Sequence, residues 1–301
     1  MARRSLIRIA LTGLFGLVSS CLVVGGMGVS GAPVPERGVD FDLEAIRILA
    51  GATGPRTLRT VEVTSGSQLG LFLRAGGDFD HHDMPVYPVE LEWASGKTVL
   101  LEPATDPVCS EPHLPVLRFD AAAYERMQQA MLRADAIVAT HEHFDHLCGL
   151  TQSPHLEALA DRALLTPEQL DGTAAMTGVD ERTRALVKPF PLPGPTALAP
   201  GVVLLPVGGH SPGSLWVYVR TEAGREWLFV GDTVWTREAL ELGRPKPRMI
   251  AWVGGEDEVL QGRLLRTLLD LQETHPEVGV LVSHDAETWQ SLLADGTFER
   301  L

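Results

Sequence analysis

The chain has 301 residues, of which 39 are acidic and 25 are basic, and 45% of its residues are hydrophobic. The first 30 residues hold three arginines and no acid, so the rest of the chain carries 39 acidic against 22 basic groups, a net charge of −17. This charge excludes a nucleic-acid binder that depends on neutralising phosphates, and the hydrophobic content predicts a packed core.

The N-terminal segment has the order of an export signal. Arg3, Arg4 and Arg8 precede an apolar run over residues 9–18, and Cys21 follows two serines. We expect residues 1–20 to be a signal peptide, residues 21–38 a tether and residues 39–301 a single domain. Residues 18–21 resemble a bacterial lipobox, which implies lipidation at Cys21 and a lipid-anchored protein of the bacterial cell envelope, outside the cytoplasm. A secreted form cut after Ala32 and an uncleaved anchor stay open.

The first half of the domain begins as β-structure. Residues 57–64 and 70–74 predict short strands, and residues 86–93 and 98–102 flank a turn at Gly96 and predict a hairpin. Asp120 is expected to cap a helix that reaches residue 134, and residues 136–140 predict a short buried strand.

The second half repeats this order. Strands are expected over residues 202–207, 215–220 and 226–230, then a helix over residues 256–274 and a last strand over residues 278–282. Strands followed by a helix, repeated once, predict an α+β fold with two sheets packed face to face and helices outside.

Seven potential metal ligands follow strands of this pattern. Four of them lie within six residues after the buried strand that ends near residue 140: His141, His143, Asp145 and His146. His210, Asp232 and His284 each follow another apolar strand. Zinc prefers imidazole nitrogen and accepts carboxylate oxygen, and the ends of strands converge. The sequence therefore predicts one metal site built from all seven side chains.

The pattern His-x-His-x-Asp-His, with the later His210, Asp232 and His284, resembles that of the metallo-β-lactamase-fold hydrolases over about residues 57–290. The lactonase-like and glyoxalase II-like branches are the most similar. The resemblance implies an αββα sandwich of two mixed β-sheets flanked by helices, with two Zn²⁺ ions at its edge; iron and manganese are alternatives.

The same resemblance implies a role for each ligand. His141, His143 and His210 would hold the first metal, Asp145, His146 and His284 the second, and Asp232 would bridge them. The expected nucleophile is a hydroxide that bridges the two zinc ions, with Asp145 as the catalytic residue that orients it.

The residues around the site favour one reaction. Lactonases of this family commonly carry Tyr three residues after the bridging Asp, where this chain has Trp235, whose indole N–H can donate to a carbonyl of the substrate. Only 17 residues follow His284, too few for the helical region of glyoxalase II enzymes. We expect hydrolysis of a lactone or another ester-type carbonyl in a small molecule. Thioester or β-lactam hydrolysis, a mononuclear-iron persulfide-type dioxygenase and a non-catalytic metal-binding lipoprotein are the alternatives.

The segment from Gly209 to Gly213 also matches the Gly-x-Ser-x-Gly motif of serine hydrolases, with Ser211 as nucleophile. Two features argue against this hypothesis. Pro212 has no N–H to offer to an oxyanion, and the following residues predict a strand where the motif requires a helix.

Cys109 and Cys148 are either free thiols or a disulfide pair, and the sequence leaves both open. Contact with a membrane is expected only through the N-terminal lipid or anchor. The oligomeric state is not predicted.

Overall fold

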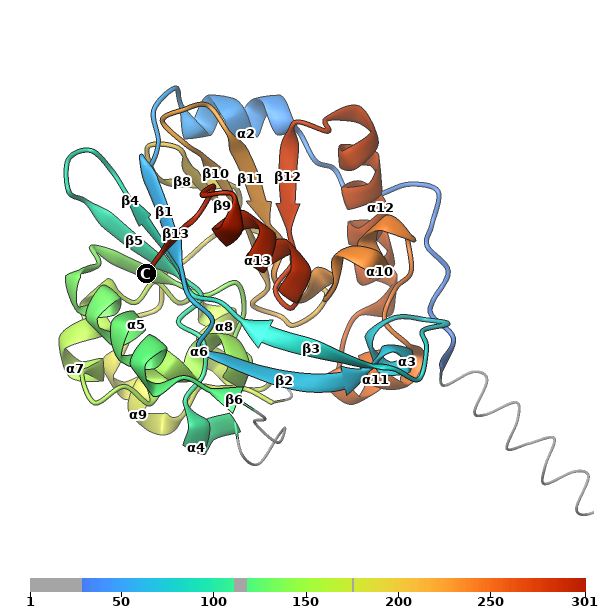
Figure 1. The fold of residues 1–301 in the computed structure, drawn as a ribbon, viewed down its shortest axis with the longest axis horizontal. Helices are drawn as coiled ribbons and strands as arrows, with labels where there is room; N and C mark the ends of the chain where they lie inside the picture. The colour runs from blue at the N-terminus through green and yellow to red at the C-terminus, as the bar shows by residue number, and fades with distance from the viewer. Residues whose placement is uncertain (1–28, 111–117, 175) are drawn as a thin grey trace, which may run out of the picture.

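The computed structural model describes residues 29–110, 118–174 and 176–301. The predicted signal peptide and Cys21 lie outside the described residues. Three β-sheets form the body of the molecule, with helices around them (Figure 1). Their strands are β1 Thr57–Thr60, β2 Thr64–Leu69, β3 His81–Val86, β4 Val89–Glu92, β5 Thr98–Leu101, β6 Arg118–Phe119, β7 Ala136–Val138, β8 Thr196–Ala199, β9 Val202–Pro206, β10 Leu215–Arg220, β11 Glu226–Phe229, β12 Val278–Leu281 and β13 Glu299–Arg300.

The helices cover the outer faces of the sheets. They are α2 Leu43–Ala50, α3 Gly70–Leu73, α4 Pro107–Ser110, α5 Ala121–Arg133, α6 Phe144–Thr151, α7 Leu156–Leu159, α8 Pro167–Asp171, α9 Glu181–Leu186, α10 Arg237–Glu241, α11 Arg248–Gly254, α12 Glu258–Thr274 and α13 Ala286–Ala294, with 3-10 turns at Ala160–Arg162 and Gly231–Thr233.

Two five-stranded mixed sheets form the centre of the fold. The first has the order β13-β1-β4-β5-β7 and the second the order β12-β11-β10-β9-β8. In the first sheet β5 and β7 run parallel while β4 and β5 run antiparallel, and in the second β11 and β12 are the parallel pair. The prediction of an α+β fold with two mixed sheets is confirmed.

The core lies in three layers. One apolar cluster fills the space between the two sheets, a second packs α5, α6 and α7 on the first sheet, and a third packs α2 and α12 on the second. Strand β10 shows how the sequence specifies this: Val217 faces the first sheet, whereas its neighbours Trp216 and Tyr218 face the helices. Because both faces of this strand are buried, its residues are apolar without alternation.

The third sheet, β3-β2-β6, departs from the prediction. The single strand expected over residues 57–64 is two strands, β1 and β2, which belong to different sheets. The strand expected over residues 86–93 is also divided, between β3 and β4. The prediction of a strand over residues 70–74 is wrong, since Gly70–Leu73 is a helical turn. A short apolar run does not distinguish a strand from a helix by its period.

The described part of the predicted tether contacts the domain. The backbone N–H of Val39 donates to Thr267 Oγ1 at 2.8 Å, and Gly31 forms a β-bridge with Pro247. No helix within the described residues is long and apolar enough to cross a membrane. Cys109 and Cys148 form a disulfide with their Cα atoms 6.3 Å apart, which ties α4 to α6.

Candidate metal centre

The predicted ligands lie in the loops, turns and first helical turn that follow four strands. His141 lies in the link from β7 to α6, His143 is the N-cap residue of α6, and Asp145 and His146 lie in the first turn of that helix. His210 lies in the loop after β9, Asp232 in the 3-10 turn after β11, and His284 between β12 and α13. Strands β9, β11 and β12 run in one direction, so their carboxyl ends meet at one edge of the second sheet.

The structure brings all seven predicted ligands together as two groups. His141, His143 and His210 form one group, and Asp145, His146, Asp232 and His284 form the other, with the ligand atoms of each group within 4.8 Å of one another. Six of the seven residues are buried, and Asp145 is partly exposed.

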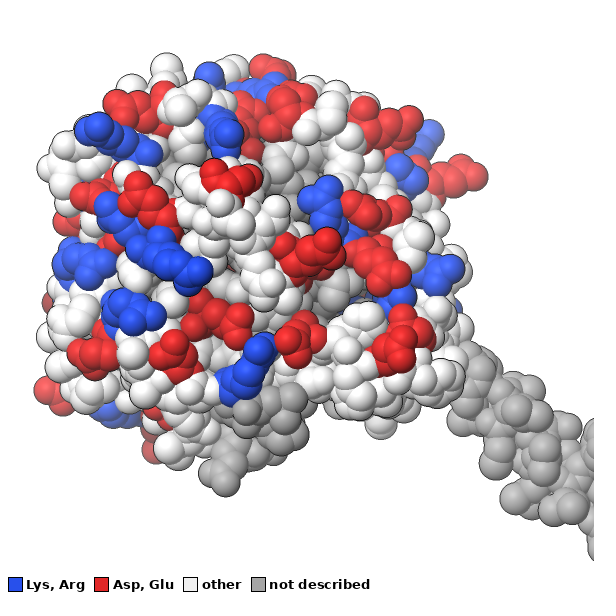
Figure 2. Space-filling model, viewed as in Figure 1, with Lys and Arg blue, Asp and Glu red and all other residues white. Residues whose placement is uncertain are grey.

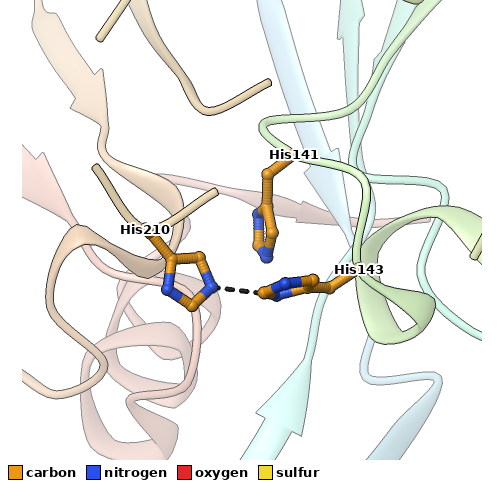
Figure 3. Close-up of side chains that lie close together, drawn as sticks. All are labelled: His141, His143 and His210. Carbon is orange, nitrogen blue, oxygen red and sulfur yellow. Dashed lines mark hydrogen bonds between the residues drawn. The ribbon is translucent and has the colours of Figure 1, made fainter. Parts of the chain in front are cut away.

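The three imidazoles of the first group point toward a common centre (Figure 3). His210 Nε2 lies 3.0 Å from His143 Nδ1, and the ring of His141 lies edge-on to both neighbours. Burial is the largest cause that holds the pKa of His141 well below its usual range. A neutral imidazole keeps the lone pair that a metal ion requires.

Asp232 belongs to the second group but also faces the first, and it presents one oxygen to each. Its Oδ2 lies 3.5 Å from His210 Nε2 and 3.9 Å from His141 Nε2. Its Oδ1 lies 3.3 Å from His146 Nε2 and 3.2 Å from His284 Nε2. This is the orientation that a bridging carboxylate needs.

In four of the imidazoles, Nδ1 lies within hydrogen-bond distance of a neighbouring side chain or backbone oxygen. Nδ1 of His146 contacts Glu102 Oε2 at 2.7 Å, and Nδ1 of His284 faces the carbonyl oxygen of Pro85 at 3.0 Å. The corresponding contacts are His141 with Thr140 Oγ1 and His210 with Glu256 Oε1. The carboxylate of Glu102 and the carbonyl of Pro85 can only accept, so they favour a proton on Nδ1 of His146 and His284 and leave Nε2 of both rings for a metal ion.

The residues present fit a pair of cations. His141 Nε2 and His146 Nε2 are buried and have no hydrogen-bond partner, which is costly unless another group binds there. Burial lowers the pKa of His146, but Asp232, Asp145 and Glu102 outweigh burial and raise it well above its usual range. The same carboxylates that favour an imidazolium would favour a bound cation.

Glu102, Lys246 and Glu256 belong to this site although no motif in the sequence indicated them. Glu256 Oε1 lies 2.8 Å from His210 Nδ1 and 2.7 Å from Lys246 Nζ, and both side chains of this ion pair are almost fully buried. Burial disfavours the charge of Glu256, but Lys246 and His210 hold the pKa of its carboxyl at about 2. Lys246 Nζ also lies 4.7 Å above the ring of Trp235. Lys246 therefore contacts both Glu256, which lies beside His210, and Trp235, which lines the pocket.

The ion pair predicts two separable effects. Glu256→Gln should lower the free energy of unfolding by about 3–5 kcal/mol, because Lys246 stays buried without its partner. The double variant Glu256→Gln/Lys246→Met should recover most of this stability, yet bind zinc at the three-histidine group about 10–100-fold more weakly. Urea unfolding and zinc titration against a chelator measure the two quantities. A double variant with unaltered zinc affinity would limit the pair to a structural role.

Backbone strain occurs beside the centre. Glu102 has a φ of 58°, in the left-handed region that a residue with a Cβ rarely adopts. Its carboxylate accepts a hydrogen bond from the backbone N–H of Thr140 at 3.0 Å while it holds His146. The strained residue thus joins the end of β5 to the ligand loop after β7.

Ser211 is buried beside Glu142 and does not have the surroundings of a nucleophile. Its hydroxyl donates to Glu142 Oε2 at 2.8 Å and lies 2.9 Å from Ser214 Oγ. Glu142 also accepts from the backbone N–H of Gly213, and the chain continues into strand β10. These bonds give Ser211 a role in holding the His210 loop in place.

An apolar pocket of about 300 Å³ opens over the two ligand groups. Asp145 and Trp235 line it together with Met84, Phe144 and Ile250. The indole N–H of Trp235, predicted to contact a substrate carbonyl, donates to Asp232 Oδ2 at 2.7 Å. Trp235 therefore presents its ring to the pocket and its N–H to the carboxylate of Asp232.

Comparison with known proteins agrees with this geometry. The family model described as the metallo-beta-lactamase superfamily matches residues 122–293, more than half of the chain. No curated protein matches the sequence.

Solved structures with the same fold are found at low sequence identity. An N-acyl homoserine lactone hydrolase with N-hexanoyl-L-homoserine at its catalytic metal centre is 17% identical, with a TM-score of 0.62, and the match covers 79% of this chain and 97% of the other. AidC, a dizinc quorum-quenching lactonase, is 12% identical with a TM-score of 0.54, and 76% and 87% are covered. A probable metal-dependent hydrolase from Staphylococcus aureus is 13% identical with a TM-score of 0.55, and 77% and 90% are covered.

Proposed function

The chain belongs to the metallo-beta-lactamase superfamily. We propose that it hydrolyses a lactone or another ester-type carbonyl with two divalent metal ions, and that these ions are zinc. The observation that carries the proposal is the position of Asp232, whose two oxygens face two separate ligand groups. The solved structures of similar fold include lactone hydrolases. Two metal ions held here would supply a hydroxide nucleophile at neutral pH and polarise an oxygen of the substrate.

Each of the seven candidate ligands has a part in this proposal. His141, His143 and His210 would hold one ion, and Asp145, His146 and His284 the other, with Asp232 shared. Asp145 is the one ligand that is partly exposed, and it lines the pocket. Its carboxylate is therefore placed to orient a water molecule and a substrate as well as to bind a metal ion.

The walls of the pocket favour a substrate with an apolar part. Phe144, Trp235 and Ile250 surround the space above the ligands. On the face shown in Figure 2, acidic and basic side chains are interspersed, and the whole chain carries a net charge of −14. A polyanion would meet repulsion at low salt, whereas a neutral ester would not.

A substrate panel on metal-counted protein tests the proposal. We expect two zinc ions per chain and faster hydrolysis of a lactone or ester than of a thioester, a β-lactam or a phosphodiester. Chelation should abolish the activity and zinc should restore it. One iron per chain with oxygen consumption on a persulfide would contradict the proposal, as would a phosphodiester that is hydrolysed fastest.

A further inference from the structure

Large apolar side chains are exposed at one end of the molecule. Trp252 of α11 is 79% exposed, and Val253 and Met249 of the same helix are 57% and 40% exposed. Phe79, between α3 and β3, is 82% exposed, and Val29 is 39% exposed. Single exposed apolar residues are ordinary, but a contiguous group of them is typical of a surface that binds a protein, a membrane or a ligand.

Contacts between backbones hold these segments side by side. The N–H of Arg248 donates to the carbonyl of Ser30 at 2.9 Å, and the N–H of Ala75 donates to the carbonyl of Pro245 at 2.8 Å. The segments of Val29 and Phe79 therefore both flank the chain that leads into α11. Figure 1 shows α3 and α11 at the same end, where the described chain begins. We call the surface formed by Val29, Phe79, Met249, Trp252 and Val253 the α11 face.

We propose that the α11 face docks on the surface of a lipid bilayer. The sequence before Val29 identifies this occupant, because it holds the apolar run over residues 9–18 and Cys21. Cys21 lies eight residues before Val29, and eight extended residues span at most about 26–29 Å. If the chain is held at the membrane by a lipid on Cys21 or by an apolar anchor, the end that carries Val29 is the end held there.

The composition of the α11 face suits the boundary between lipid and water. Tryptophan is enriched there because its ring is apolar and its N–H is polar. Nearby charges have both signs: Arg248 pairs with Glu258 at 3.5 Å, and Arg74 pairs with Asp78 at 3.1 Å. Docking should therefore depend on apolar contact and need no anionic lipid.

Docking would also orient the pocket. Ile250, Val253 and Gly254 of α11 line the pocket above the ligand groups, so the helix that would touch the lipid also forms the pocket wall. The mouth of the pocket would then border the membrane. This inference concerns where the protein sits and does not depend on which bond the proposed hydrolase cleaves.

Lipid-phase quenching of tryptophan fluorescence tests the docking. The full chain is reconstituted in phosphatidylcholine vesicles with and without brominated acyl chains. Residues 1–28 contain no tryptophan, so any quenching reports on the folded domain. We expect brominated lipid to quench the emission, and Trp252→Phe to remove most of that quenching, since a docked side chain lies about 5–10 Å into the interface.

Two further variants make the test specific. Trp227→Phe removes a half-buried indole of β11 and should leave the quenching by lipid unchanged. Met249→Asp keeps Trp252 but places a charge on the α11 face, and should weaken the quenching. Vesicle-bound protein without quenching, or quenching that persists in Trp252→Phe, would overturn the proposal. Neither result depends on hydrolytic activity.

Discussion

Asp232→Asn is expected to empty the second ligand group of its metal and to reduce hydrolysis by about a thousandfold. An asparagine would keep one oxygen for the indole N–H of Trp235, which donates to Oδ2. Its amide NH₂ would then replace Oδ1, the atom that faces His146 and His284. An NH₂ group does not bind a cation, and a metal ion that acts as Lewis acid contributes several kcal/mol, with each 1.4 kcal/mol worth a factor of ten.

Metal content and hydrolysis rate of the same preparation measure both effects. We expect about one metal ion per Asp232→Asn chain, held by the three histidines of the first group. Ser211→Ala is the matched control, because Ser211 is equally buried but bonds to Glu142. It should keep both metal ions and lose at most about tenfold in rate, as expected for one hydrogen bond. Two metal ions and an unchanged rate in Asp232→Asn would remove the bridging role, and inactivation by Ser211→Ala with both metals retained would favour a serine nucleophile.

The clustering of the seven candidate ligands could be predicted because each of them follows a strand with a strong apolar pattern. His141 lies shortly after the end of β7 at Val138, and His284 lies shortly after the end of β12 at Leu281. Strands that run in the same direction end at the same side of a sheet, so the convergence of these residues can be predicted without knowing any side-chain contact. The ligand set therefore depends on local sequence and on one topological rule.

The supporting residues could not be predicted because their role arises only from tertiary contact. Glu102 is 44 residues from His146, and Glu256 is 46 residues from His210. Lys246 lies in the loop between α10 and α11, which has no periodic pattern, yet its side chain is buried in the folded chain. Glu102 had one signal, since it directly follows β5, the parallel neighbour of β7.

The errors in the fold have the same origin. Residues 57–69 supply strands to two different sheets, and the break between β1 and β2 lies at residues 61–63, two of which are buried valines. Apolar residues between two strands continue the hydrophobic pattern of the strands, so the sequence does not reveal the break. The third sheet also depends on β6, a strand of two residues that gives no periodicity.

Asp145→Asn is expected to lower the rate of hydrolysis by about 10²–10⁴-fold, the range found when a positioned acid or base is lost. Asp145 lies in the first turn of α6, and its Oδ2 lies 3.5 Å from His284 Nε2 and 3.7 Å from His146 Nε2. It therefore shares the second ligand group, and it is the one member of that group that is partly exposed where it lines the pocket. Its loss should affect both metal binding and the orientation of the nucleophile.

Comparison with His284→Ala separates these two functions, because His284 is a buried member of the same group whose Nδ1 faces the carbonyl of Pro85. Excess zinc should restore much of the rate of His284→Ala, since that variant lacks only a ligand. The same zinc should fill the site of Asp145→Asn without restoring its rate, since the missing carboxylate would still not orient the nucleophile. Equal rescue of the two variants by zinc would assign Asp145 to metal binding alone.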